Sequence, residues 1–296
     1  MVDPTPVIVG ASGSSGKGWS ELKDIECLRR YSYIKAIEAA RLAAESNAKR
    51  DGLPIPARVE TAYDEAFQTG IFMHAARAKW LCLGQSADTA ILTQCNQAGR
   101  DDCAGQGMPL PELSFLEYSL MFIAYANYWA IRPKLKPYAV ELFLDHNFGD
   151  MDDLSGAYVR STRYDDLCWY PDAGGYCIGE FKTTYDLSGA LRYYDQNNPQ
   201  ILLQWLLYKR SKHVHPDIKG TMVDIWDKGK NRGTRHFVPL EERLLPRFEV
   251  WLRQTLHVRL SAMKGLNPRN YLVCNTYNDA YKSKCAFKER CMNDNA

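Results

Sequence analysis

The stretch YPDAGGYCIGEFKTT, residues 170–184, decides the fold that we predict for this chain. Residues 175–184 are rich in β-forming side chains and follow a cluster of Asp and Gly, which predicts a strand entered from a turn. In such a strand, Glu180 and Lys182 project from one face, while Phe181 between them points to the other. A carboxylate and an ammonium group therefore share one site.

That pairing suits phosphodiester hydrolysis. The carboxylate of Glu180 can hold Mg²⁺ or Mn²⁺, which polarises a phosphate and lowers the pKa of an attacking water. Lys182 can position that water and stabilise the negative charge that develops. Glu-x-Lys also occurs on exposed strands as a salt-bridge pattern, so the two interpretations have to be separated by other parts of the chain.

The rest of the chain combines helices with short strands. Apolar residues recur with helical spacing in five segments, at residues 21–46, 64–81, 113–131, 198–212 and 240–265. The strand-forming segments are AVELFL, SGAYVRSTRY, GYCIGEFKTT and KGTMVDIWDKG, at residues 139–144, 155–164, 175–184 and 219–229. The first three of these predict an antiparallel meander. The sequence thus predicts an α/β fold in which helices surround a small mixed sheet.

The composition indicates a soluble globular protein, because 46% of its 296 residues are hydrophobic, 24% are charged, and the formal net charge is +2. The last 96 residues hold 18 Lys and Arg against 9 Asp and Glu, and the first 200 hold 19 against 26, which predicts a C-terminal part that faces a polyanion. No basic region followed by an apolar run opens the sequence, and its most apolar long segment, YSLMFIAYANYWAI, is too short to span a membrane. We therefore expect a cytoplasmic protein with no membrane attachment.

A glycine-rich segment near the start, PVIVGASGSSGKGWSEL, raises a phosphate-loop interpretation. That loop needs Gly, four residues, and then Gly-Lys-Ser/Thr. Here Ala11 occupies the place of the first glycine, and Gly18 replaces the hydroxyl that binds magnesium. A nucleotide hydrolase is therefore only a distant third hypothesis, which substitution of Lys17 would test, and a lead-in that caps the following helix is favoured.

Five motifs, in order along the chain, resemble those of the PD-(D/E)XK nuclease superfamily, specifically its RecB-like branch as found in phages. They are SGSSGKGWSELKDIECLRRYSY with its Cys-x-Arg-x-Tyr signature, the helix GIFMHAARA, the strand GEFKTT, the Gln-bearing helix NPQILLQWLLYK, and the cysteine-containing CNTYNDAYKSKCAFKERC. The resemblance implies a restriction-endonuclease-like core formed by a single domain over residues 1–296. It also implies a metal-dependent DNA nuclease, in particular an exonuclease on ends or single strands, acting in phage-type recombination, replication or repair in a bacterial or phage-infected cell.

The resemblance also assigns roles to single residues. His74 follows Gly70 by four residues on one helical face, so its imidazole can reach a metal held beside Glu180, although a hydrogen-bonded core histidine is the plainer alternative. The backbone carbonyl of Phe181 is implied as a further metal ligand. A helical stripe that the family turns toward its active site comprises Gln200, Gln204 and Tyr208. The sequence does not choose between the two glutamines.

The second metal-binding carboxylate of the family is the weakest match. Its expected place, the fourth position of a Gly-x-x-Asp strand, is taken by Val159, and Asp172 lies eight residues before Glu180, which is roughly 26 Å along an extended strand. Hairpin arithmetic places position 160 opposite Glu180 if the loop centres near residue 170, and position 151 if the turn is YDDL. In the second case Asp152 or Asp153 comes within reach, and we favour Asp153, with Glu141 as a supporting acid.

The nine cysteines offer a second metal site. Cys274, Cys285 and Cys291 fall in the last 23 residues, and three thiols cannot close a tetrahedral site. In iron-sulphur relatives such as AddB and the CRISPR-adaptation exonucleases, one N-terminal cysteine joins three C-terminal ones, and Cys27 stands at the matching position. The resemblance therefore implies a 4Fe-4S cluster, or alternatively a structural zinc, that joins the N-terminal helical segment to the tail from about residue 265. The other five cysteines have no ligand spacing, which predicts core or loop residues.

DNA contacts are predicted along basic segments in which Lys and Arg alternate with hydroxyl, amide and aromatic residues. The candidate cations are Lys209, Arg210, Lys212, Lys228, Lys230, Arg232 and Arg235. No base-reading motif is visible, so we expect weak sequence specificity, and a recombinase or single-strand-binding protein is a partner by family analogy alone. The alternative to an active nuclease is a nuclease fold, weakened by the loss at Val159, that binds DNA or a partner.

Overall fold

The computed structural model describes residues 8–9, 46–47, 50, 62–149, 159–211 and 216–263. The chain divides into two compact units, the first formed by residues 1–15, 60–146 and 161–248, and the second by residues 16–59, 147–160 and 249–296. The candidate site and the helices around it belong to the first unit. The predicted helix at residues 21–46 lies almost wholly outside the described residues.

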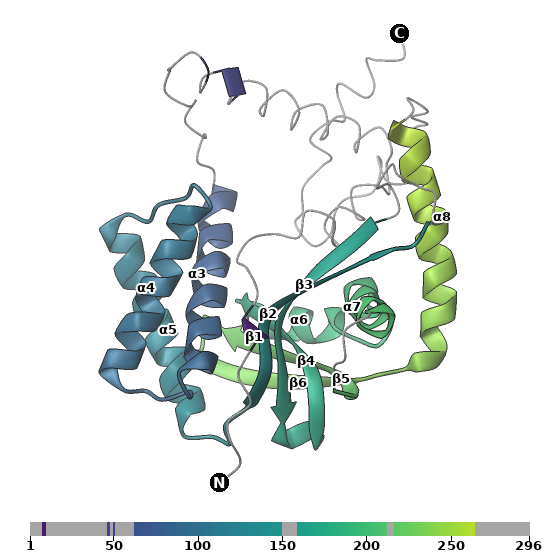
Figure 1. The fold of residues 1–296 in the computed structure, drawn as a ribbon. Coiled ribbons are helices and arrows are strands. Elements are labelled where there is room, and N and C mark those ends of the chain that lie inside the picture. Colours follow the sequence, from purple (N-terminus) through teal and green to yellow (C-terminus); the bar gives the residue numbers. More distant parts are fainter. Residues whose placement is uncertain are drawn as a thin grey trace. The chain divides into compact units, whose positions relative to one another are not determined.

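In the part of the chain that the structure describes, six strands form one sheet in the order β1-β2-β3-β4-β5-β6 (Figure 1). They are β1 (Ile8–Val9), β2 (Lys136–Asn147), β3 (Val159–Tyr170), β4 (Gly175–Thr184), β5 (Ile218–Asp227) and β6 (Arg232–Pro239). β1 runs parallel to β2 and β4 parallel to β5, whereas β3–β4 and β5–β6 are antiparallel pairs. The sheet is therefore mixed, which confirms the predicted α/β fold.

Helices lie on both sides of this sheet (Figure 1). α3 (Ala62–Cys82), α4 (Thr89–Gly105) and α5 (Glu112–Ala130) gather on one side, where Phe72, Phe122, Phe181 and Trp226 are buried together in one core. α6 (Leu187–Tyr193) and α7 (Pro199–Arg210) form the crossover that the parallel pair β4–β5 requires, and they lie on the other side. The sequence predicted α3, α5 and α7, but it did not predict α4, α6, β1 or β6.

The capping residues explain where these helices begin. The side chain of Asp88 accepts a hydrogen bond from the Ala90 N–H at the start of α4. Asn198 caps α7 in the same way, with Pro199 in the first turn, where a missing N–H costs nothing. α8 (Leu245–Met263) corresponds to the helix predicted at residues 240–265. Among the described helices, none is both long and apolar enough to cross a membrane.

The β3–β4 hairpin has a different register from either one that the sequence suggested. Its turn is a short 3₁₀ segment, Pro171–Ala173, closed by Gly174 in the left-handed conformation with φ 60°. The paired residues run from Tyr170 and Gly175 back to Asp166 and Gly179, and Asp165 and Glu180 are the next residues along the two strands. The expectation that position 160 or 151 lies opposite Glu180 is therefore wrong. The turn is centred beyond residue 170, so the residues of β3 that pair with β4 lie later in the sequence than expected.

A buried ion-pair network fastens α3 to the sheet. The guanidinium of Arg77, 1% exposed, lies 2.7 Å from Asp166 Oδ2 on β3 and 3.4 Å from Asp224 Oδ2 on β5. Tyr125 of α5 donates a 2.8 Å hydrogen bond to the same Asp224 oxygen, and the Tyr170 hydroxyl donates to Asp166. Buried charges are tolerated only when they are paired and hydrogen-bonded, as these are. The network fixes how α3 lies against β3 and β5.

Candidate metal centre

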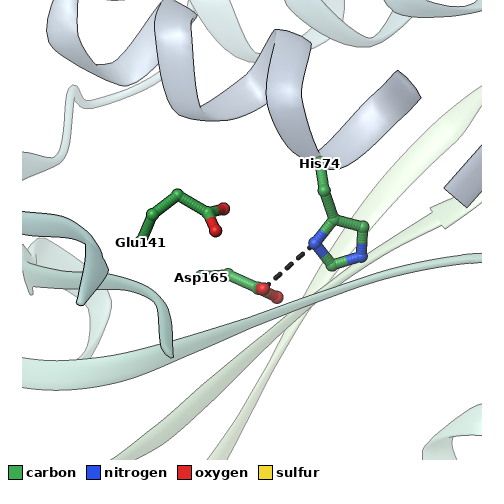
Figure 2. Close-up of side chains that lie close together, drawn as sticks. All are labelled: His74, Glu141 and Asp165. Atoms are coloured by element: carbon green, nitrogen blue, oxygen red, sulfur yellow. Dashed lines mark hydrogen bonds and ion pairs between the residues drawn. The ribbon is translucent and has the colours of Figure 1, made fainter. Parts of the chain in front are cut away.

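His74 projects from α3 toward β3, where it meets an acid that the sequence did not single out. Its Nδ1 lies 3.0 Å from Asp165 Oδ1 (Figure 2). The edge of its ring packs against Phe181, with ring centres 5.2 Å apart. The other Asp165 oxygen accepts a 2.6 Å hydrogen bond from the Phe181 backbone N–H. Asp165 therefore connects the histidine of α3 to the Glu-x-Lys segment of β4.

Two consecutive aspartates on β3 serve different partners. Asp165 holds His74, whereas Asp166 holds Arg77, which lies three residues further along α3. The Asp166 carboxylate lies directly over Gly179, where a Cβ atom would come within 2.1 Å of it. A glycine before Glu180 is thus required by packing, which gives a physical reason for the first residue of GEFKTT.

Glu141 of β2 completes a cluster with His74 and Asp165. One possible ligand atom from each of the three residues lies within 4.8 Å of the others, and Figure 2 shows both carboxylates turned toward the imidazole. Glu141 has φ 55°, a left-handed backbone conformation that costs a non-glycine residue about 1–3 kcal/mol. This break in the strand accompanies four consecutive buried residues, from Ala139 to Leu142, in place of alternation. Strain of this kind is typical of functional sites.

The cluster separates the pKa values of its two acids. Burial raises the pKa of Glu141 to about 7, and the Asp165 carboxylate adds to the rise, while Arg163 opposes it. Burial would also raise the pKa of Asp165, but His74, Lys182 and the Phe181 N–H outweigh it, and this pKa is held below its ordinary value. One acid is therefore firmly ionised, and the other carries its proton more readily.

Glu180 comes one residue before Phe181, whose N–H donates to Asp165, and its carboxylate is held by three donors. Its Oε1 accepts hydrogen bonds from Gln200 Nε2 at 2.6 Å and lies 2.8 Å from Lys182 Nζ, and its Oε2 accepts from Gln204 Nε2 at 2.7 Å. Both glutamines thus bind the same carboxylate, one on each oxygen. The sequence left open whether Gln200 or Gln204 reaches the site, and in the structure both contact Glu180. Burial alone would lower the pKa of Lys182, but Glu180, Tyr194 and Asp165 raise it well above its ordinary value.

The donor set suits a hard divalent cation. Carboxylate oxygens are the ligands that Mg²⁺ and Mn²⁺ prefer, and an imidazole nitrogen is common beside them at Mn²⁺. Glu141 Oε2 is buried, and Arg163 Nε lies 2.8 Å away as its ion-pair partner. The Asp165 carboxylate still repels that of Glu141 and raises its pKa, and a bound cation would offset this repulsion. His74, Glu141 and Asp165 therefore form the candidate metal centre, with Glu180 adjoining it.

The remaining predicted residues lie elsewhere. The Tyr208 hydroxyl donates to the Pro216 carbonyl, which draws it away from Glu180. Asp153 and the four cysteines predicted to bind a cluster, Cys27, Cys274, Cys285 and Cys291, lie outside the described residues, and the Phe181 carbonyl stays a prediction. The sequence analysis did not predict Asp165, because the second metal-binding carboxylate was expected at the place of Val159. The signal that could have found it is the pair of aspartates in RYDDLCWY, two acids inside an otherwise apolar strand.

The predicted DNA-binding cations differ in their surroundings. Lys209 lies 2.7 Å from Glu242, Arg232 lies 3.7 Å from Asp227, and Lys228 lies over the Tyr185 ring at 4.3 Å. The Arg235 guanidinium packs over the Trp129 ring at 3.8 Å, and its Nε is buried, so its environment favours a role in packing. Lys212 lies outside the described residues. Among the cysteines that are described, Cys95, Cys103, Cys168 and Cys177 are buried free thiols, as predicted, whereas Cys82 is an exposed free thiol at the end of α3 rather than a core or loop residue.

Comparison with known proteins adds little to this geometry. No family model and no curated protein matches the chain. A solved structure described as "Crystal structure of SSO0001" matches with a TM-score of 0.29 and 9% sequence identity, over 79% of this chain and 88% of that one. A likeness of this size carries no argument about function, so the family resemblance in the sequence stays a prediction.

Proposed function

We propose that this protein is a DNA nuclease that depends on Mg²⁺ or Mn²⁺. The observation that carries the proposal is Asp165, an acid on β3 that accepts a hydrogen bond from the Phe181 N–H, next to Glu180 in the chain, and holds His74 of α3. A histidine, two acids on neighbouring strands and a lysine two residues after the second acid form the set that phosphodiester hydrolysis with a metal requires. Glu141 adds a third acid to this set.

A divalent cation at this centre supplies Lewis-acid chemistry, because it polarises the phosphate and lowers the pKa of a bound water. His74, Glu141 and Asp165 would hold the ion, with Glu180 available beside them. Gln200 and Gln204 fix the orientation of the Glu180 carboxylate. Lys182, whose raised pKa keeps it protonated at neutral pH, can stabilise negative charge on the phosphate but cannot serve as a base.

DNA is the substrate that the surrounding charges favour. Lys228, Lys230 and Arg232 lie at the β5–β6 turn, which is the turn that Tyr185 contacts. Tyr185 follows Lys182 by three residues and is 74% exposed, so a base that is not paired could stack on its ring. This arrangement favours single strands or frayed ends over intact duplex, and recombination, replication or repair are the settings in which such ends occur.

A nuclease fold that only binds DNA was the alternative, and it rested on the missing acid at Val159. Asp165 weakens that reason, because it supplies a carboxylate beside the Glu-x-Lys segment from a different position in the strand. We therefore favour an active enzyme.

The deciding experiment measures degradation of end-labelled single- and double-stranded DNA by the full chain, purified anaerobically, with Mn²⁺, Mg²⁺ or EDTA. We expect cleavage with the metals and none with EDTA. Asp165→Asn should lower the rate by at least about 100-fold, since even residues that only orient metal ligands cost about 10–100-fold. Asp172→Asn is the matched control, because this exposed aspartate on the hairpin turn contacts none of these residues.

Metal-independent cleavage, or cleavage that Asp165→Asn leaves intact, would contradict the proposal. Binding of Mn²⁺ without cleavage of any DNA would favour the alternative of a binding module.

A further inference from the structure

A pocket of about 650 Å³ opens beside the candidate metal centre and is not explained by metal binding. It lies among α3, α4, β2 and β3, and His74 and Glu141 form part of its wall. Volumes of about 300–1,000 Å³ are typical of sites for small organic molecules. The pocket is therefore large enough for a group of nucleotide size next to the metal ligands.

Small side chains on two helices create this space. Ala75 and Ala78 line it from α3, and Ala98 and Gly105 line it from α4, at spacings that place each pair on one helical face. Val140 of β2 adds an apolar surface. Flat apolar surfaces of this kind accept the face of a nucleobase, which is hydrophobic above and below its ring plane.

A buried ion pair lies at one end of the pocket. Glu141, only 7% exposed, lines the wall together with Arg163, whose Nε lies 2.8 Å from Glu141 Oε2. This pair and the imidazole of His74 mark the end of the pocket at which a metal-bound phosphate would lie. The pocket therefore combines an apolar surface with charged groups at one end, which small residues alone would not provide.

Polar groups at the pocket wall match the edges of a base. Asp101 and Asp102 of α4 line the pocket, as does Gln106. Each aspartate uses one oxygen to accept a hydrogen bond from a glutamine four residues away, so the other oxygen can accept from the amino group of a base. Lys79 contributes a positive charge for a phosphate.

We propose that this pocket receives an unpaired nucleotide adjacent to the phosphate that is cleaved. The inference rests on the proposed nuclease function and adds its substrate class, because a base inside a duplex cannot enter a pocket without leaving its stack and its pairing partner. Single strands and unpaired ends are then the substrates, and blunt duplex DNA is cleaved slowly. Amino groups on the base favour cytosine, adenine or guanine over thymine in the pocket.

The test fills the pocket from a wall that does not touch the metal ligands. Ala98→Trp places an indole in the pocket, and Ala104→Trp places the same indole on an exposed position of the same helix. We expect Ala98→Trp to lower kcat/KM on a single-stranded oligonucleotide by at least about tenfold, equal to about 1.4 kcal/mol. Its melting temperature and its Mn²⁺ affinity should match those of Ala104→Trp, which should cleave normally.

A second measurement keeps the proposal testable if Ala98→Trp does not fold. Titration of the unmodified protein with deoxycytidine monophosphate, in Mn²⁺, should give saturable binding that thymidine monophosphate matches less well. The pocket assignment would be overturned if Ala98→Trp folds and cleaves normally, or if the unmodified protein binds no mononucleotide. Neither result would contradict the proposed nuclease function. Mononucleotide binding by a protein that cleaves no DNA would instead overturn the proposed function and retain the pocket as a nucleotide site.

Discussion

Each oxygen of Glu180 has its own glutamine, and the two glutamines differ in burial. Gln204 is 2% exposed and bonds Oε2, whereas Gln200 is half-buried and shares Oε1 with Lys182. Removing Gln204 leaves Oε2 without its donor in a place that water does not reach. Removing Gln200 leaves Lys182 on the same oxygen.

We therefore predict unequal losses for the two glutamines. Gln204→Ala should lower kcat at saturating Mn²⁺ by about 10–100-fold, and Gln200→Ala should lower it less. Gln94→Ala, an exposed glutamine of α4, is the control that should cleave normally. Equal rates for all three variants would show that Glu180 needs no orientation by these side chains.

Glu141 predicts how stability depends on pH in the metal-free protein. Its pKa is raised to about 7 in the folded chain, above the value of about 4.3 in an unfolded one. Between these values the folded state binds more protons, so the free energy of unfolding falls as pH rises from about 5 to 8, by up to about 3 kcal/mol. Asp165, whose pKa is lowered, acts only below about pH 4.

Urea unfolding in EDTA at several pH values between 5 and 8 measures this slope. Glu141→Gln should flatten it, because glutamine does not titrate. A slope that is unchanged in Glu141→Gln would assign the pH dependence to other groups.

The sequence located part of this site and missed the rest for a physical reason. Glu180 and Lys182 belong to one local strand motif and His74 to one local helix motif, and spacing within a single element is enough to recognise each motif. Asp165 depends on the register between two strands, which the hairpin turn sets. β3 is buried on both faces through most of its length, so its residues do not alternate, and the sequence gives no period that fixes the register.

At the scale of elements, two neighbouring side chains of α3 attach this helix to β3. His74 and Arg77 lie three residues apart and pair with adjacent aspartates of β3. Arg77 also reaches Asp224 of β5, so one side chain ties a helix to two strands. Any movement of α3 along the sheet would separate both pairs and displace the imidazole.

Arg77→Met should therefore lower the free energy of unfolding by about 3–5 kcal/mol, because it leaves buried aspartates without their cation. Arg100→Met is the matched control on α4, since its partner Glu112 is exposed and such surface pairs contribute about 0–1 kcal/mol. Urea unfolding of both variants checks this difference. Equal stability of the two variants would mean that Asp166 and Asp224 are neutral or find another donor.

The elements that the sequence missed have weak signals. The buried positions of α4 are Leu92, Cys95, Asn96, Gly99 and Cys103, which repeat at helical spacing but include small and polar side chains. β6 buries only Gly233 and Val238 of its eight residues, so it lacks the run of apolar residues that marks a strand. Both elements take their place from packing against better-marked neighbours, α3 and β5.

At the scale of the whole molecule, the second metal site stays a proposal. Cys27 comes from the N-terminal part, and Cys274, Cys285 and Cys291 come from the last residues, all outside the described ranges. A cluster held by them would link both ends of the chain, and its binding energy would add to that of folding.

Metal analysis of anaerobically purified protein tests this link. We expect about four iron and four sulphide per chain, or one zinc if the site is structural zinc. Replacing the four cysteines by serine should remove the metal and lower the melting temperature, whereas the same replacement of Cys82, an exposed free thiol, should change neither. Protein that contains neither metal, isolated without oxygen, would contradict a cluster.

The two consecutive aspartates of β3, Asp165 and Asp166, predict which substitutions evolution can tolerate in related proteins. Asp166 supports the fold through Arg77, and in the proposed nuclease Asp165 holds the metal with His74, so selection would act differently on two adjacent residues. We expect a gene copy that loses Asp165 to encode a stable protein, which could acquire a binding role. A copy that loses Asp166 leaves Arg77 without this partner, so we expect it to encode an unstable protein and to be lost. Inactive descendants should therefore keep the second aspartate and vary at the first.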